Sequence, residues 1–278
     1  MDSMLTMEMF CNECHLRTEI PNLIASKVTG FNSLSLLFAR YKQMRQGYNC
    51  SYMEWKGIFT PDLKPFKDYD DTSAVVMPIF DSKFRKDFDN MGVGSIGIDL
   101  PTWFNIDHDN MRIMLIAQDP LRNNYWYGDC YDLIVSSPFG LHDATHRTKG
   151  NGGKMVNLLI QKLIGYGYGV YLTDAYKYFI YDRKTSIAYS KKRLNDYVDI
   201  LKQELDLVKP ALCVCLGNRS KYLLEKCFTN VKSIVVPHLS GTARGAIIKR
   251  FPTLRENRST PENIANLYVQ EIVKSVKL

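Results

Sequence analysis

The chain has 278 residues, 45% of them hydrophobic and 23% charged, with a formal net charge of +7, which are the totals of an ordinary soluble globular protein. No apolar run reaches the roughly 18 residues of a membrane span, and the N-terminus lacks the basic and apolar regions of a secretory signal. We therefore expect a cytoplasmic or nuclear protein that is neither membrane-bound nor secreted, with its seven cysteines mostly reduced.

The first hundred residues show no strong repeating pattern. Residues 31–46 have the apolar spacing of an amphipathic helix, and residues 82–92 are typical of a short helix that ends at Gly92. Residues 1–110 hold 11 Lys and Arg against 15 Asp and Glu, a net charge of −4. We expect residues 1–104 to form an N-terminal extension packed on the rest of the chain.

From about residue 111 onward, short apolar runs alternate with helical patterns. The sequence predicts strands at residues 111–117, 170–175, 211–217 and 232–237. It predicts helices at residues 151–167, 190–210, 218–228 and 260–276. This alternation is typical of a parallel sheet that is covered by helices on both faces. We therefore predict a three-layer α/β/α domain over residues 105–278, with a central four-stranded parallel sheet.

Polar and charged residues follow the predicted strands. In open parallel sheets, ligands bind outside the carboxyl ends of the strands. Those positions hold Gln118-Asp119-Pro120, Asp174-Ala175, Gly217-Asn218 and His238-Leu239-Ser240-Gly241. A turn aspartate or a structural histidine explains each residue taken singly. Their convergence on one edge of the sheet predicts a functional site there.

Four segments resemble motifs of the uracil-DNA glycosylase superfamily, in the family's order. Residues 117–120, Ala-Gln-Asp-Pro, are similar to its first catalytic motif, Gly-Gln-Asp-Pro. Residues 137–140, Ser-Pro-Phe-Gly, resemble the segment whose phenylalanine stacks on the extruded base. Residues 172–175 stand where the family has a strand that ends in a base-reading asparagine. Residues 237–244 resemble the last motif, which is His-Pro-Ser-Pro in one branch and Asn-Pro-Ser-Gly-Leu-Ser-Arg in another.

The resemblance implies a uracil-DNA glycosylase-like fold and a monofunctional DNA glycosylase. Such a DNA-repair hydrolase flips a uracil or another aberrant base out of the duplex and cuts its N-glycosidic bond without a cofactor. Cleavage builds positive charge on the sugar and negative charge on the leaving base. Asp119 is then the expected catalytic carboxylate beneath the sugar, and His238 the expected donor near the base.

The same resemblance implies contacts to the base and to DNA. The expected base-binding residues are Gln118, Phe139 and Asp174, with Tyr125, Trp126 and Tyr127 as rivals for the stacking role. The expected DNA contacts are Ser240, Gly241, Thr242, Arg244 and Lys177. Residues 111–278 carry 25 Lys and Arg against 14 Asp and Glu, a net charge of +11. That charge suits a polyanionic partner, although a solvated basic surface explains it too.

Three departures from the family pattern bear on specificity. Ala117 replaces the glycine before Gln118, and Leu239 replaces the proline after His238, which predicts a less rigid loop. Asp174 replaces the base-reading asparagine. An asparagine amide offers a donor and an acceptor, which suits uracil N3–H and O4 together, whereas an ionised aspartate only accepts. A protonated Asp174 would still read uracil; a base with an exocyclic amino group or a damaged base is equally open.

Cys11 and Cys14 are weak candidates for a metal site. Their spacing resembles the N-terminal pair of the superfamily's iron–sulphur branch. Such a cluster needs four thiolates, and the other two family positions fall near Tyr178 and Val198, where this sequence has no cysteine. A structural zinc ion is the other metal alternative, with Cys11, Cys14, His15 and Cys50 as possible ligands. We expect reduced, unligated cysteines, and no cofactor.

Two other functions stay open. The same fold with a decayed pocket would be a non-catalytic DNA- or protein-binding module, which Asp174 and Leu239 favour. A hydrolase of a free nucleoside or nucleotide would keep the catalysis and lack a basic groove beside the pocket. We expect DNA as the partner, no membrane association, and a monomer.

Overall fold

The structure is a computed structural model that describes residues 64–65, 75–78, 95–99, 101–105, 111–120, 132–141, 151–181, 194–256 and 259–277, together with Glu19 and Leu23. The helices predicted at residues 31–46 and 82–92 lie outside these ranges, as do Cys11, Cys14 and the aromatic residues at 125–127. None of the helices in the described ranges combines the length and the apolar character that crossing a membrane requires.

Within the described residues, five strands form the main sheet, in the order β10-β9-β5-β7-β4. The parallel strands are β5 (Arg112–Ala117), β7 (Gly169–Asp174), β9 (Leu212–Leu216) and β10 (Ser233–Val236). These are the four strands that the sequence predicts, so the parallel core is confirmed. β4 (Thr102–Phe104) adds an antiparallel edge beside β7. β4 was not predicted, because three residues are too few to show an apolar period.

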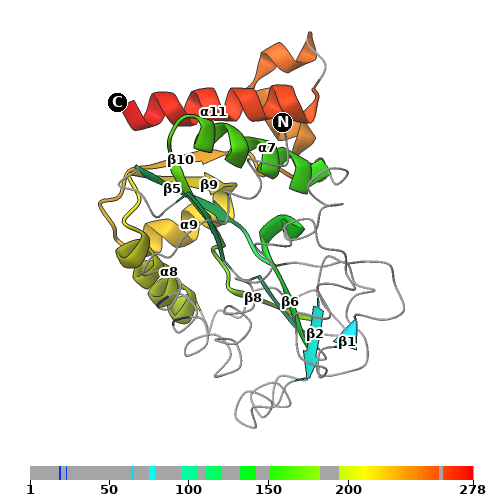
Figure 1. Ribbon diagram of the computed structural model, residues 1–278, viewed down its shortest axis with the longest axis vertical. Helices are drawn as coiled ribbons and strands as arrows, with labels where there is room; N and C mark the ends of the chain where they lie inside the picture. Colours follow the sequence, from blue (N-terminus) through cyan, green and yellow to red (C-terminus); the bar gives the residue numbers. More distant parts are fainter. Residues whose placement is uncertain are drawn as a thin grey trace.

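Helices cover both faces of this sheet (Figure 1). α7 (Asn151–Gly165) and α11 (Pro261–Lys277) pack together on one face, while α8 (Leu194–Val208) and α9 (Asn218–Lys226) lie on the other. The crossover from β5 to β7 runs toward one edge of the sheet, and the later crossovers run back toward the other. Because such crossovers are right-handed, this reversal moves the helices to the opposite face. The three-layer α/β/α architecture is therefore confirmed.

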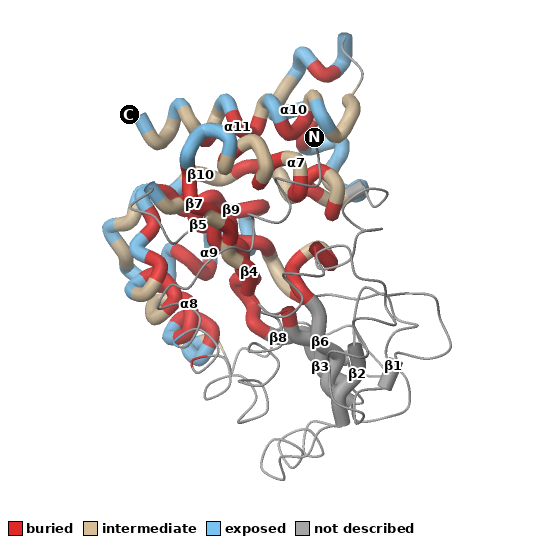
Figure 2. Tube along the Cα trace, viewed as in Figure 1, coloured by how far each residue is buried: buried red, intermediate tan, exposed pale blue. Residues whose placement is uncertain are grey.

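The core lies where the helices meet the parallel sheet. Both faces of the central strands are covered, so these strands are continuous apolar runs. β7 and β9 are buried along their whole length, and Figure 2 shows burial concentrated on the strands and the adjoining helices. In α7, Met155, Leu159 and Leu163 are buried at a four-residue spacing, which places them on one side of the helix.

A second sheet of five described strands was not predicted. Its order is β1 (Lys64–Pro65), β2 (Val75–Pro78), β6 (Asp132–Ser136), β3 (Ser95–Asp99) and β8 (Tyr178–Tyr181). β3 belongs to the first hundred residues, yet it pairs with β6 and β8. Hydrogen bonds therefore tie residues 95–99 to the part of the chain that follows. The division at residue 104 stays a prediction.

The carboxyl ends of the parallel strands form the edge where the site was expected. The connection that leaves β5 goes to one face, and those that leave its neighbours β7 and β9 go to the other. Such a divergence opens a crevice at the end of the first strand. Backbone pairing continues past the strands, because the Tyr176 N–H donates to the Gln118 carbonyl oxygen at 3.0 Å. The segment that leaves β5 is thus held against the segment that leaves β7.

Candidate functional site

A cavity of about 480 Å³ lies at this edge of the sheet. The residues that line it are Asp99, Ala117, Gln118, Asp119, Phe139, Asp174, His238, Ser240, Thr242 and Ala243. Each of the four segments that resemble glycosylase motifs contributes to this lining. Segments far apart in the sequence therefore meet around one space, as the strand-end pattern predicts.

Asp119 lies in the cavity wall directly after β5. Gln118 donates a hydrogen bond from Nε2 to Asp119 Oδ2 at 2.6 Å. Both side chains are half-buried, so the carboxylate is oriented by its neighbour and still accessible from the cavity. A carboxylate in this setting can stabilise a developing cation and accept a proton from water.

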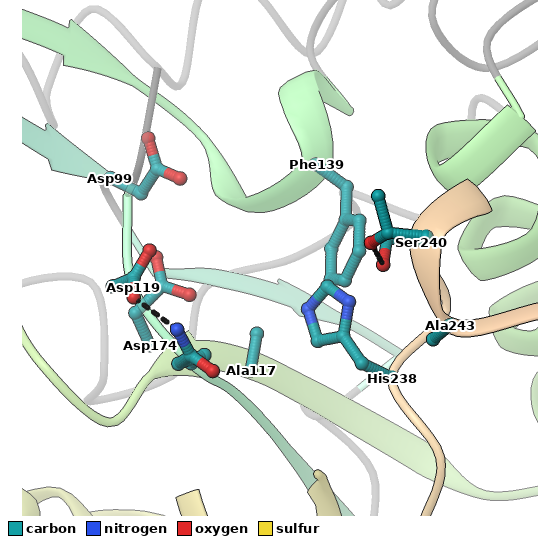
Figure 3. A pocket seen from close by; sticks show the side chains of 10 residues that line it. Asp99, Ala117, Asp119, Phe139, Asp174, His238, Ser240 and Ala243 are labelled. Atoms are coloured by element: carbon teal, nitrogen blue, oxygen red, sulfur yellow. Dashed lines mark hydrogen bonds between the residues drawn. The ribbon is translucent and has the colours of Figure 1, made fainter. Parts of the chain in front are cut away.

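Asp174 is the last residue of β7, and its side chain is 3% exposed. The strand register pairs Asp174 with Ala117, two residues before Asp119. The two carboxylates therefore come from neighbouring strand ends, and Figure 3 shows them on the same side of the cavity. Ala117, the last residue of β5, also lines the cavity.

Asp99 is a further carboxylate of the cavity, and sequence analysis did not single it out. It ends β3 and is 7% exposed. The register pairs it with Ser136, directly before the segment that carries Phe139. In the sequence, Asp99 ends a short apolar run, and this pattern could have marked it as a site residue, as it did for Asp119. Asp99 was not recognised because the first hundred residues show no alternation of strands and helices.

Phe139 and His238 form an aromatic wall on the other side of the cavity (Figure 3). Their ring centroids lie 5.3 Å apart and their planes differ by 26°, a stacked arrangement. Phe139 has a φ of 58°, in the left-handed region that a bulky residue rarely adopts. Such strain costs on the order of 1 kcal/mol and is typical of functional sites. Here it accompanies a ring that faces the cavity.

The spacing of this aromatic pair limits how a base could stack. A base inserted between two rings needs them roughly 7 Å apart, twice the contact distance of about 3.5 Å. The observed separation of 5.3 Å is smaller. A flipped base must therefore stack on the opposite face of one ring or push the two rings apart.

The charge of His238 follows from its surroundings. Burial lowers the pKa of His238, and the nearby negative charge of Asp119 raises it by a smaller amount. The imidazole is therefore neutral at pH 7 and has one N–H to donate. It can act as a hydrogen-bond donor in the cavity, but not as a standing positive charge.

The loop after His238 is anchored by Leu239, whose side chain is fully buried. A Cβ atom at Gly152, in the first turn of α7, would lie 3.0 Å from the Leu239 carbonyl oxygen. Glycine therefore allows the helix and the loop to approach closely. An apolar side chain in the core therefore anchors the segment where the family has a proline. The lower rigidity of the loop stays a prediction.

The other expected DNA contacts lie around the mouth of the cavity. Ser240 and Thr242 line it, and their hydroxyl groups are hydrogen-bonded to each other at 2.9 Å. Gly241 is exposed, and so is Arg244, which begins α10 (Arg244–Arg250) and donates a hydrogen bond to the Ser259 hydroxyl. Contact of these four residues with DNA stays a prediction.

Lys177 does not belong to this group, and the expectation that it contacts DNA is wrong. Its side chain is 3% exposed, and its Nζ donates to Thr173 Oγ1 at 2.7 Å and to the Glu204 carboxylate. Glu204 also accepts hydrogen bonds from the hydroxyl groups of Tyr171 and Thr173, each at 2.8 Å. The ammonium group is therefore committed to the interior, which a reading of the sequence around the strand end could not reveal.

In the described part of the chain, no three His, Cys, Asp or Glu side chains are grouped as metal ligands. Cys213 and Cys215 are buried in β9, where burial raises the pKa of both thiols, that of Cys215 to about 12. These thiols pack in the core. The candidates Cys11 and Cys14 lie outside the described residues.

Comparison with known proteins bears on the identity of this site. The family model described as the uracil DNA glycosylase superfamily matches residues 104–256, more than half of the chain. None of the curated proteins compared with the chain matches it. The matched range contains the parallel sheet and all the lining residues of the cavity except Asp99. By its motifs, its fold and this match, the chain belongs to the uracil-DNA glycosylase superfamily.

Proposed function

We propose that this protein is a monofunctional DNA glycosylase that hydrolyses the N-glycosidic bond of a flipped-out uracil or other aberrant base. The observation that carries the proposal is the cavity, with Asp119 on one side and the Phe139–His238 pair on the other. Its volume of about 480 Å³ is ample for a base and its sugar. A glycosylase needs a carboxylate for the sugar and an aromatic face for the extruded base.

The proposed reaction uses the groups of this cavity in sequence. The bond between C1′ and the base nitrogen breaks, and its electron pair goes to the leaving base. Asp119 stabilises the positive charge that develops on the sugar, then accepts a proton as water adds to C1′. Gln118 keeps that carboxylate in place through its hydrogen bond. For a base that leaves as an anion, the neutral His238 donates a hydrogen bond to a base oxygen.

Charge beside the cavity supports DNA, rather than a free nucleoside, as the substrate. α10 begins directly after the lining residue Ala243 and carries exposed Arg244, Lys249 and Arg250. It contains no acidic residue. Arg250 is paired with Glu271, so Arg244 and Lys249 contribute most to the local positive charge. A basic helix at the mouth of the cavity suits a phosphate backbone.

The decisive variant is Asp119→Asn. We expect wild type to leave abasic sites in labelled single- or double-stranded oligonucleotides that contain uracil, hypoxanthine or a mismatched or damaged base. Asp119→Asn should lower the rate about 100-fold or more, because the amide cannot accept the proton. Cleavage at abasic sites by alkali, followed by gel electrophoresis, measures the rate.

Asp199→Asn is the matched control, since it removes an exposed carboxylate from α8. It should leave the rate unchanged. A wild-type protein that binds DNA in a salt-sensitive way but produces no abasic site on any substrate would contradict the proposal. That result would instead support the non-catalytic binding module, which Asp174 favours by standing where the family has asparagine.

A further inference from the structure

The acidic side of the cavity bears on which base it accepts. Among the described lining residues, Asp99, Asp119 and Asp174 are carboxylates, and none is a lysine or an arginine. Figure 3 shows these carboxylates on the side opposite the Phe139–His238 rings. A ligand in this space therefore meets hydrogen-bond acceptors on one side and an aromatic face on the other.

Asp174 stands where the family has its base-reading asparagine, so in a glycosylase it would face the edge of the base. It is 3% exposed and lines the cavity. Uracil presents N3–H between two carbonyl oxygens, so a carboxylate that accepts this N–H also faces an oxygen that repels it. A base with an amino group next to a ring N–H instead offers two donors side by side. The two carboxylate oxygens can accept one hydrogen bond from each.

The net charge of the cavity favours a base that is also a cation. Carboxylates near a ligand stabilise its positively charged form, and a neutral His238 adds no opposing charge. The ring of Phe139 adds a cation–π attraction for a charged base stacked on it. The acceptor-rich side and the aromatic side thus favour the same kind of ligand.

We propose that the pocket takes a cationic base with an amino group beside a ring N–H, the chemistry shared by guanine alkylated at N7 and cytosine protonated at N3. This inference rests on the proposed glycosylase function and narrows its substrate. In alkylated guanine, the C1′–N9 bond breaks and its electron pair neutralises the charged ring. Water adds to C1′ and its proton passes to Asp119. The base leaves neutral, so no anion on the base needs stabilisation.

The test compares base release from duplex oligonucleotides that carry one 7-methylguanine, one cytosine or one uracil at the same position, with the full-length protein. Released bases are separated by chromatography, and reactions without protein correct for spontaneous loss. We expect wild type to release 7-methylguanine, cytosine or both at least about tenfold faster than uracil. A factor of about ten is the discrimination against the wrong base that one good pair of hydrogen bonds provides. Asp174→Asn should reverse the order, and Asp199→Asn should keep it.

Repeating the release measurements at several pH values distinguishes protonated cytosine from alkylated guanine as the preferred base. Cytosine must take up a proton to match the pocket, so its release should rise as the pH falls. 7-Methylguanine is already cationic and keeps its ring N–H below neutral pH, so its release should not rise as the pH falls further. If Asp174→Asn does not fold, as judged by circular dichroism, the order of release by wild type decides alone.

Other outcomes overturn either this inference or the function beneath it. Faster release of uracil than of both cationic bases would overturn the inference and leave the glycosylase function standing. If wild type releases no base at all, the glycosylase function fails. Binding of 7-methylguanosine and of uridine, measured by calorimetry, then decides the preference. Equal or weaker binding of 7-methylguanosine would overturn the inference as well.

Discussion

At the scale of single residues, His238 makes stability depend on pH with a definite sign. Burial lowers its pKa from 6.5 in the folded protein, while the unfolded chain keeps the ordinary value. Around pH 6.5, the unfolded state therefore binds more protons at this residue than the folded state does. The free energy of unfolding contributed by this residue falls as the pH drops through that range.

Replacing His238 with asparagine removes this dependence. We expect wild type to lose stability relative to His238→Asn between about pH 7.5 and about pH 5.5, because asparagine has no proton to take up. Urea unfolding of both proteins at each pH measures the difference. If wild type instead became more stable relative to His238→Asn as the pH falls, the lowered pKa of His238 would be contradicted.

Residue types and their places after strands were enough to predict much of the site. Asp119, Phe139, Asp174 and His238 were expected to meet, and they line one cavity. Asp99 was missed because its strand belongs to a sheet built from segments distant in sequence. The wrong expectation that Lys177 contacts DNA has another cause. Whether a charged side chain near a strand end is exposed or buried depends on its partner. That partner, Glu204, lies on another element.

At the scale of elements, α8 is joined to β7 by a buried polar network. Glu204 on α8 is fully buried, and it accepts hydrogen bonds from Tyr171, Thr173 and Lys177. Burial raises the pKa of Tyr171, and the charge of Glu204 raises it further, so its hydroxyl stays a donor. Thr173, a member of this network, directly precedes Asp174 in β7. The network therefore holds the strand end that supplies the proposed base-reading position.

Removing one charge of this network should destabilise the fold strongly. Glu204→Gln leaves the Lys177 ammonium buried without its counter-charge, which costs about 3–5 kcal/mol in the free energy of unfolding. Replacing both residues with apolar ones should recover much of that loss. Urea unfolding of the single and double variants measures both effects.

Glu225→Gln is the matched control for that experiment. Its partner Lys221 lies 3.4 Å away on α9, with side-chain exposures of 46% for Lys221 and 61% for Glu225. An exposed pair at this spacing is worth about 0.5 kcal/mol at most. If Glu204→Gln and Glu225→Gln lowered the free energy of unfolding equally, the buried network would contribute no more to stability than an exposed ion pair.

The helices and strands that could be predicted were those long enough to show a regular apolar pattern. The helices α7, α8, α9 and α11 and the parallel strands were found because each shows its apolar pattern within one segment. α10 has seven residues and β4 has three, too few for a period to emerge. The second sheet joins strands across long separations, and such pairing is set by tertiary contacts that no local pattern contains.

For the whole molecule, the distribution of charge predicts how DNA binding responds to salt. Arg244 lies exposed beside the cavity, whereas Lys232 lies exposed just before β10, at the amino ends of the parallel strands. Arg244→Gln should weaken DNA binding and reduce the slope of log affinity against log salt by about 1, because one phosphate contact is lost.

Fluorescence anisotropy with a labelled duplex at several salt concentrations measures that slope. Lys232→Gln removes the same charge from the opposite edge of the sheet and should leave the slope unchanged. If both variants reduce the slope equally, DNA binding depends on overall charge rather than on the surface beside the cavity.

The position of β5 in the sheet also bears on how the protein is made. β5 lies at the centre, between β7 and β9, yet both neighbours follow it in the chain. Synthesis at about 5–20 residues per second leaves β5 waiting on the order of seconds for β9 to emerge from the ribosome. During that wait an apolar strand has unpaired edges, which makes the nascent chain a candidate for chaperone capture. Since His238 follows both β9 and β10 in the chain, the cavity is completed only after these strands have also been made.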